Sequence, residues 1–139
     1  MDNIIELLHK GKYSCVISNG SEIRTFTKRG VIDLYELLES NPKFLNGSSI
    51  ADKVVGKAAA TLMILGNVAH IYADIISEPA IALLKNSQIE LKFGKVIPYI
   101  ENRDKSGICP LETICCNANS QEEIYLLIKE FVERIQNKN

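Results

Sequence analysis

The stretch "VAHIYADIISEPAIALLKNSQIELKFG", residues 68–94, predicts a strand, a helix and a second strand in immediate succession. Its opening run, "VAHIYADII", is apolar enough for a buried strand. "SEPAIALLKNS" predicts a helix, because Ser77 can cap its amino end and Pro79 suits the first turn. "IELKFG" predicts the next strand. Strands joined by a helical crossover usually pair in parallel, so this unit indicates an α/β fold.

Upstream of this unit the sequence predicts an antiparallel hairpin between two helices. "YSCVISNGSEIRTFT" contains two β-rich runs around Asn19-Gly20, which is a strong signal for a tight turn. "DNIIELLHKG" predicts a short amphipathic helix before the hairpin, and "GVIDLYELLESNP" predicts a helix that stops before Pro42. "KFLNGSS" is expected to be a loop. An antiparallel hairpin beside parallel strands gives a mixed sheet.

The stretch "ADKVVGKAAATLMILG", residues 51–66, is expected to be a helix that begins near Ile50. Ser49 and Asp52 have the S-x-x-D spacing of a helix start. Lys57 then stands near the mouth of a helix whose later residues are almost all apolar, so the helix should be covered on most sides. A lysine in such a place either faces a pocket, reaches water, or pairs with an acid such as Glu78 or Glu112.

The carboxy-terminal part predicts an extended segment and two helices. "KVIPYIENR" contains Pro98, which favours an edge strand or a loop. "CPLETICC" predicts a short helix opened by Pro110. "SQEEIYLLIKEFVERI" predicts a long helix with a Ser120–Glu123 capping box. Its apolar stripe, which suits either the core or an interface between copies, comprises Ile124, Leu127, Ile128, Phe131 and Ile135.

Composition restricts the class of protein. The 139 residues suit one domain, residues 1–139, and are 46% hydrophobic and 24% charged, as in ordinary soluble globular proteins. A net charge of −1 argues against a nucleic-acid partner. The sequence has no apolar run long enough for a membrane span and no basic signal region, so we expect a cytoplasmic protein whose four cysteines remain thiols.

Two segments resemble the cytidine-deaminase-like family. "GKAAATLMILG" occupies the place where that family begins a helix with H-A-E, and "YADIISEPAIALLKNSQIELKFG" resembles its later strand, E-P-C-x-x-C helix start and strand. "ADKVVGKAAA", "SEPA" and "CPLE" also resemble a bacterial and archaeal domain-of-unknown-function family that shares this fold. The resemblance implies a three-layer cytidine-deaminase-like fold, with a mixed sheet of about four to five strands flanked by helices.

The same resemblance places unsuitable residues at the zinc site. The first metal ligand would fall near Lys57 and the general acid/base glutamate near Ala59, while the two thiolates would fall at Ala80 and Leu83. A catalytic zinc needs three protein ligands from cysteine, histidine or acidic side chains. We therefore expect neither a metal site nor a cofactor at this position.

Cys109 and Glu112 are the second pair of candidates. In "GICPLE", Cys109 would occupy the cap position of the helix opened by Pro110. The positive end of a helix lowers a thiol's pKa and favours the nucleophilic thiolate, and Glu112 could carry a proton there. Alternatively, Cys109 is a small buried residue at an ordinary helix start. The C-x5-C-C spacing of Cys109, Cys115 and Cys116 matches no standard metal site.

Five further residues are candidate ligand contacts. Asn102 and Arg103 lie in the polar loop "PYIENRDKSG" and can bind carboxylate or phosphate groups. Asp74 and Glu78 lie near the end of a strand and the start of the next helix, where open α/β sheets bind ligands. Lys53 is expected one helical turn before Lys57, where it either extends a cationic patch or lies on the surface.

The sequence thus favours a deaminase-fold protein without zinc that binds a small polar or nucleotide-like ligand at a pocket of Lys57, Cys109 and Glu112. One alternative is an enzyme with Cys109 as nucleophile or redox group and Lys57 as cation or base. Another is a non-catalytic sensor or partner-binding module. Catalysis and oligomeric state are left open by the sequence.

Overall fold

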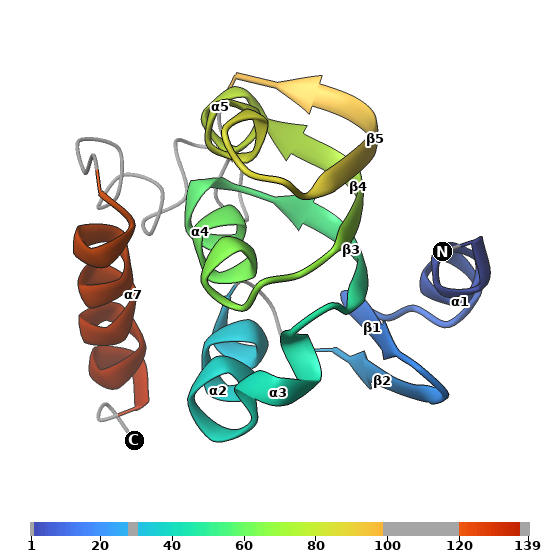
Figure 1. Ribbon diagram of the computed structural model, residues 1–139, viewed down its shortest axis with the longest axis horizontal. Coiled ribbons are helices and arrows are strands. Elements are labelled where there is room, and N and C mark those ends of the chain that lie inside the picture. The colour runs from blue at the N-terminus through green and yellow to red at the C-terminus, as the bar shows by residue number, and fades with distance from the viewer. Residues whose placement is uncertain (1, 28–30, 99–119, 137–139) are drawn as a thin grey trace.

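The computed structural model describes residues 2–27, 31–98 and 120–136, and it contains one five-stranded sheet. The strands are β1 (Cys15–Asn19), β2 (Glu22–Phe26), β3 (Ser49–Val55), β4 (His70–Ser77) and β5 (Glu90–Ile97). The helices are α1 (Asp2–Lys10), α2 (Ile32–Ser40), α3 (Pro42–Leu45), α4 (Lys57–Leu65), α5 (Glu78–Lys85) and α7 (Gln121–Gln136). The order of strands across the sheet is β2-β1-β3-β4-β5 (Figure 1).

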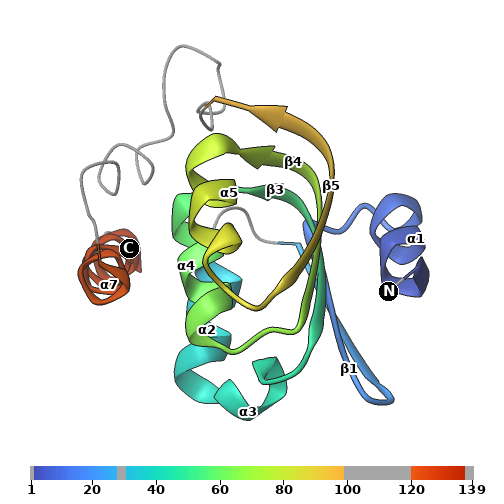
Figure 2. The same ribbon diagram turned by 45° about the horizontal axis from the view of Figure 1, so that its top comes forward.

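The sheet is mixed, as the sequence predicts. β1 pairs antiparallel with both β2 and β3, whereas β3, β4 and β5 run parallel to one another. The hairpin turns at Asn19-Gly20, and Gly20 has φ +63, a conformation that favours glycine. Figure 2 shows α1 on one face of the sheet and α2, α4 and α5 on the other, with α7 outside this helix layer. The prediction of an α/β fold with a mixed sheet is confirmed.

The predicted helix start at Ile50 is wrong. Ser49–Val55 forms β3, the middle strand of the sheet, and the helix α4 begins only at Lys57, after Gly56 as its N-cap. The backbone of β3 pairs with β1 on one side and β4 on the other, which outweighs the local S-x-x-D signal. The Asp52 carboxylate accepts a hydrogen bond from the Val54 N–H at 3.3 Å and caps no helix.

The other predicted elements agree with the structure, with one addition. The Ser77 hydroxyl accepts from the Ala80 N–H at 3.3 Å and caps α5, and the Ser120 hydroxyl accepts from the Glu123 N–H at 3.1 Å at the start of α7. The segment expected to be a loop contains the short helix α3, which opens with Pro42. β5 is an edge strand that ends just before Pro98. The helix predicted at Pro110 lies outside the described residues.

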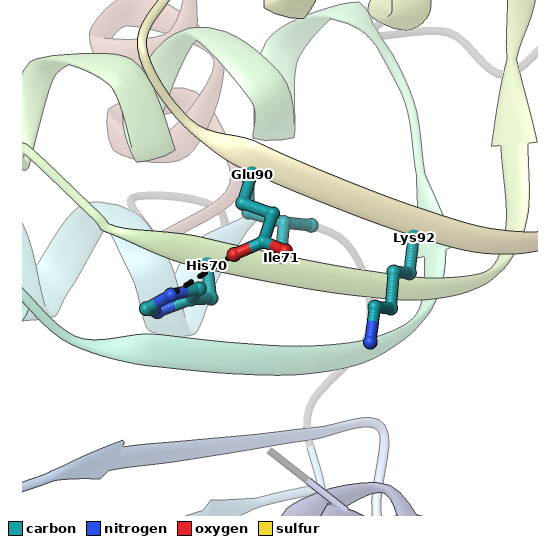
Figure 3. Close-up of a pocket in the computed structure, with 4 residues that line it drawn as sticks. All are labelled: His70, Ile71, Glu90 and Lys92. Carbon is teal, nitrogen blue, oxygen red and sulfur yellow. Dashed lines mark ion pairs between the residues drawn. The ribbon is translucent and has the colours of Figure 1, made fainter.

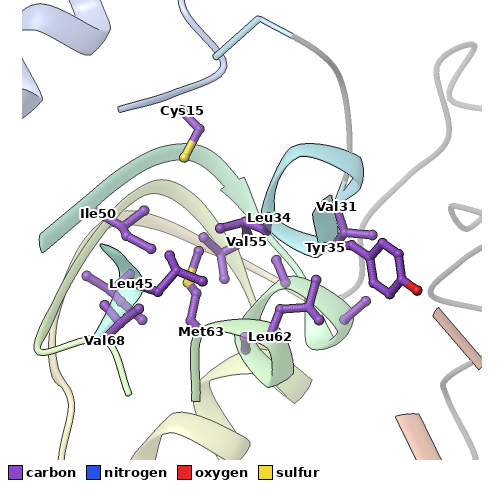
Figure 4. Packing of buried hydrophobic residues seen from close by; sticks show 14 of the residues in the cluster. Cys15, Val31, Leu34, Tyr35, Leu45, Ile50, Val55, Leu62, Met63 and Val68 are labelled. Atoms are coloured by element: carbon purple, nitrogen blue, oxygen red, sulfur yellow. The ribbon is translucent and has the colours of Figure 1, made fainter. Parts of the chain in front are cut away.

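The main core lies between the sheet and the layer of α2, α4 and α5 (Figure 4). In α4 every residue from Ala58 to Met63 is buried, as expected for a helix covered on most sides. Helix α7 adds Ile124, Ile128 and Val132 to this core, whereas Leu127 and Phe131 are partly buried. The side chain of Ile135 lies outside the described residues. Within the described ranges, no helix is long and apolar enough to cross a bilayer.

A second, smaller apolar cluster holds α1 on the opposite face of the sheet. Its buried members are Ile4, Leu8, Val16 and Ala51. Helix α1 therefore covers the β1 and β3 part of this face (Figure 1). Tyr72 of β4 packs against the same cluster.

Candidate functional site

Lys57 is the first residue of α4 and directly follows the junction from β3. Its side chain is half-buried, although the next six residues of the helix, 58–63, are buried. Its carbonyl accepts a hydrogen bond from the buried Thr61 hydroxyl at 2.9 Å, so the one polar side chain of this apolar segment is satisfied inside its own helix. The structure thus puts an ammonium group at the amino end of a buried helix.

Two helix starts lie at the same edge of the sheet. The parallel register pairs Val55 of β3 with Ile76 of β4. Lys57 lies two residues after Val55, and Glu78 lies two residues after Ile76, so the two helix starts are at the same level. Helices α4 and α5, which begin at these two residues, pack against each other (Figure 1). Strand β5 is parallel to β4 and ends at this edge too. This edge carries the carboxyl ends of three parallel strands, where α/β proteins commonly bind ligands.

Asp74 does not join Lys57, because it faces α1 on the other side of the sheet. Its Oδ1 accepts a hydrogen bond from the Tyr72 hydroxyl at 2.7 Å and lies 2.7 Å from His9 Nε2. The hydrogen bond to Asp74, followed by burial, raises the pKa of the Tyr72 hydroxyl. Lys53 does not lie a helical turn before Lys57 either. It is exposed on β3, where the chain is extended.

The structure reveals an acidic cluster that the sequence analysis missed. Cys15 on β1 lies directly opposite Asp52 on β3 in the antiparallel ladder, and Asp33 in the first turn of α2 acts on both electrostatically. Burial raises the pKa of the Cys15 thiol well above its ordinary value, and Asp52 and Asp33 raise it further. Cys15 belongs to the main core, which lies on the helix-covered face of the sheet (Figure 4).

Asp52 is the group in this cluster that is best suited to exchange a proton near neutral pH. Burial raises the pKa of its carboxyl to about 7, against the lowering effect of hydrogen bonds from the backbone N–H groups of Val54 and Lys53. The nearby negative charges of Asp74 and Asp33 add to the increase. The only sequence signal for this site is an acidic residue within an apolar strand. Its partners depend on the strand register, which the sequence does not state.

The remaining predicted site residues, Asn102, Arg103, Cys109 and Glu112, lie outside the described residues. The described residues can be tested for a metal site. Among residues 2–27, 31–98 and 120–136, no three histidine, cysteine or acidic side chains come together as a metal site would require.

The model of the TM1506 family, a domain of unknown function also called DUF1893, matches residues 3–132. The chain belongs to the DUF1893 family. The fold is also similar to the crystal structure of a DUF1893 protein, TM1506 from Thermotoga maritima, with a TM-score of 0.85 and 27% sequence identity. That similarity covers 93% of this chain and 87% of the other. No curated protein matches the sequence.

For this DUF1893 protein, the described residues therefore offer two chemically different places on one side of the sheet. At the carboxyl edge of the parallel strands, Lys57 supplies a cation beside a helix amino end, and both favour an anionic group. Farther back along β3, Asp52 supplies a carboxyl that changes charge near pH 7. Both residues belong to the segment 52–57, so a single short stretch of chain carries a cation and a titratable acid.

Proposed function

We propose that this DUF1893 protein has a deaminase-like fold without the zinc ligands, and that it binds a small polar or nucleotide-like ligand at the start of α4. The observation that carries the proposal is the position of Lys57, half-buried at the amino end of a helix that is otherwise covered. An ammonium group at the positive end of a helix favours a phosphate or carboxylate. The ligand is therefore expected to carry at least one such group.

The order of elements supports the deaminase-like part of the proposal. The resemblance requires a helix that starts near Lys57, then a strand, a helix that starts at "EPA", and a further strand. The structure has α4 from Lys57, β4, α5 from Glu78 and β5 in that order. The boundaries of α4 and α5 thus fall where the family's two motifs begin.

The residues at the corresponding zinc positions do not fit a zinc ion. Lys57 would have to give up its proton to act as a ligand, and Ala80 and Leu83 carry no ligating atom. Ala59, at the position of the general acid/base glutamate, is buried and cannot transfer a proton. The proposed chemistry at the start of α4 therefore begins from the ammonium group of Lys57.

Glu78 and three residues of the segment that follows β5 are proposed to complete the binding site. Glu78, exposed in the first turn of α5, can accept hydrogen bonds from a ligand hydroxyl or amine. Because β5 ends at this edge, the segment that follows it is proposed to supply Arg103, Cys109 and Glu112. Arg103 would add a second group that binds an anion.

Thermal unfolding in the presence of a nucleotide and metabolite library tests this proposal. A ligand at 100 times its dissociation constant should stabilise the protein by about 2.7 kcal/mol. Lys57→Ala should abolish the shift, whereas Lys85→Ala, a change at an exposed lysine of the last turn of α5, should preserve it. The absence of any stabilising ligand, or an equal shift in Lys57→Ala, would contradict the binding role.

A further inference from the structure

Three polar side chains form a row on the face of the sheet that carries α1. Ser49, His70 and Glu90 are the first residues of β3, β4 and β5, and the parallel register pairs Ser49 with His70 and His70 with Glu90. They lie at the amino ends of these strands, whereas Lys57 and Glu78 follow the carboxyl ends. The row is therefore at the opposite edge of the sheet from the proposed ligand site.

The row is connected by two contacts through the imidazole ring. The Ser49 hydroxyl lies 3.3 Å from His70 Nδ1. On the other side of the ring, His70 Nε2 lies 3.2 Å from a carboxylate oxygen of Glu90 (Figure 3). With its hydrogen on Nε2, directed at Glu90, the neutral ring has Nδ1 available to accept the serine proton. A nucleophile within reach of a base, with the base oriented by a third group, is the general arrangement for nucleophilic catalysis.

A hollow of about 210 Å³ adjoins this row. It is lined by His70, Ile71, Glu90 and Lys92, so one imidazole, one carboxylate and one ammonium group surround the same small volume. In Figure 3 the Lys92 side chain lies on the same side of the sheet as His70 and Glu90. The side chains of His70 and Glu90 are 46% and 64% exposed, so a small molecule from solution can reach them.

We infer that Ser49, His70 and Glu90 form a second site, which uses the Ser49 hydroxyl as a nucleophile toward small esters. The Ser49 oxygen attacks the acyl carbon, and its proton passes to His70 Nδ1. The bond from the acyl carbon to the alcohol oxygen then breaks, and His70 returns the proton to the departing alcohol. Water hydrolyses the acyl-serine by the same route and releases the carboxylic acid.

Each of the other polar groups has a distinct part in this scheme. Glu90 is a positioning residue, because it holds the ring in the tautomer that leaves Nδ1 as the acceptor. Lys92, on the wall of the hollow, provides positive charge for the oxyanion that forms when Ser49 adds to the carbonyl. The size of the hollow favours small acyl groups.

An alkyl fluorophosphonate tests this site, because an activated serine displaces fluoride from phosphorus and retains the alkylphosphonyl group. The full-length protein would be treated at neutral pH and digested, and the peptide of residues 44–53 would be fragmented to distinguish Ser49 from Ser48. Ser49 should be modified, and the fully buried Ser48 should not. His70→Gln should slow the modification at least about tenfold, because it removes the base.

Two controls separate activation from mere exposure. Ser18 lies opposite Ser49 on β1, so Ser18→Ala changes a neighbouring strand serine and should leave the modification of Ser49 unchanged. Glu90→Gln should slow the reaction with an unchanged melting temperature, because Glu90 is largely exposed. Absence of modification at Ser49, or an equal rate in His70→Gln with its fold intact, would overturn the inference. Neither result would affect the Lys57 proposal, which concerns the other edge of the sheet.

Discussion

His9 Nε2 lies 2.7 Å from Asp74 Oδ1, and this contact joins α1 to the strand β4 across 65 positions of the sequence. The Tyr72 hydroxyl donates to the same oxygen, and the rings of His9 and Tyr72 meet edge to face with centroids 6.1 Å apart. Apart from this polar group, α1 is held by the small cluster that includes Ile4 and Leu8. Among the described residues, α1 is thus attached to the sheet by this apolar cluster and by a carboxylate of β4.

Replacing His9 with alanine should loosen α1 without unfolding the rest of the protein. Because the His9 side chain is 49% exposed, solvent screens the pair, and its loss should lower the free energy of unfolding by at most about 1 kcal/mol. Amide hydrogen exchange should become faster in α1 than in β3 or β4. Lys10→Ala is the matched control, because it breaks only the Lys10–Glu6 pair within the helix. Equal exchange in both variants would show that His9 does not hold the helix.

Asp52→Asn should stabilise the protein at high pH and change little at low pH. The carboxyl of Asp52 has a pKa near 7 in the folded state and near 4 when unfolded, so the folded state holds the proton more tightly between these values. Its contribution to stability is therefore present below about pH 4 and is lost as the pH rises to about 7. The asparagine amide avoids this loss.

The measurement is chemical unfolding of both proteins at several pH values. The difference in the free energy of unfolding, variant minus parent, should grow between about pH 4 and 7 and then level off, at on the order of 1 to 4 kcal/mol. Asp33→Asn removes one of the negative charges that raise the pKa of Asp52. When Asp52→Asn is compared with its parent in the Asp33→Asn protein, the rise in the free-energy difference should therefore shift to lower pH. Parallel curves for Asp52→Asn and the parent across this range would refute the assignment.

Local signals in the sequence predict structure better than pairings between distant segments do. The hairpin at Asn19-Gly20 and the Ser77 cap of α5 were predictable, because each depends on residues that are neighbours in the chain. β3 was not, since the S-x-x-D pattern is a valid local signal that the pairing with β1 and β4 outweighs. Ile50, Val54 and Val55 are β-branched residues that favour a strand, and Gly56 separates them from the helix.

In the candidate site too, features that depend on neighbouring residues are predictable from the sequence, and features that depend on strand pairing are not. A buried helix after Lys57 is predictable, because the apolar run that follows it is continuous in the sequence, whereas the predicted start of that helix at Ile50 is wrong. The pairing of Cys15 with Asp52 is not predictable, because it requires the antiparallel register of two strands far apart in the chain. Asp74 was expected near Lys57 from its place in β4, but strand residues alternate between faces and Asp74 faces α1.

Cysteine reactivity should differ strongly along the chain. Cys15 is 6% exposed and its thiol has a raised pKa, so it should react with iodoacetamide only after unfolding. If Cys109 is a nucleophile, as its predicted helix-cap position suggests, it should react at least about tenfold faster than Cys15, Cys115 and Cys116 at neutral pH. Mass spectrometry of timed digests measures all four, with Cys109→Ser as control. Slow and equal labelling would contradict the use of Cys109 in catalysis.

Two residues of α7 provide a test of how this helix is attached. Ile128 is fully buried against the main core, whereas Leu126, on the same helix, is 57% exposed. Ile128→Ala should lower the free energy of unfolding by about 2 to 5 kcal/mol, because it leaves a cavity between α7 and the helices α4 and α2 that it packs against. Leu126→Ala should change it by less than about 0.5 kcal/mol, since the side chain is largely in water. Urea unfolding gives both values. A comparable loss in the two variants would mean that Leu126 is also covered in solution, which is the result expected if α7 forms an interface between copies.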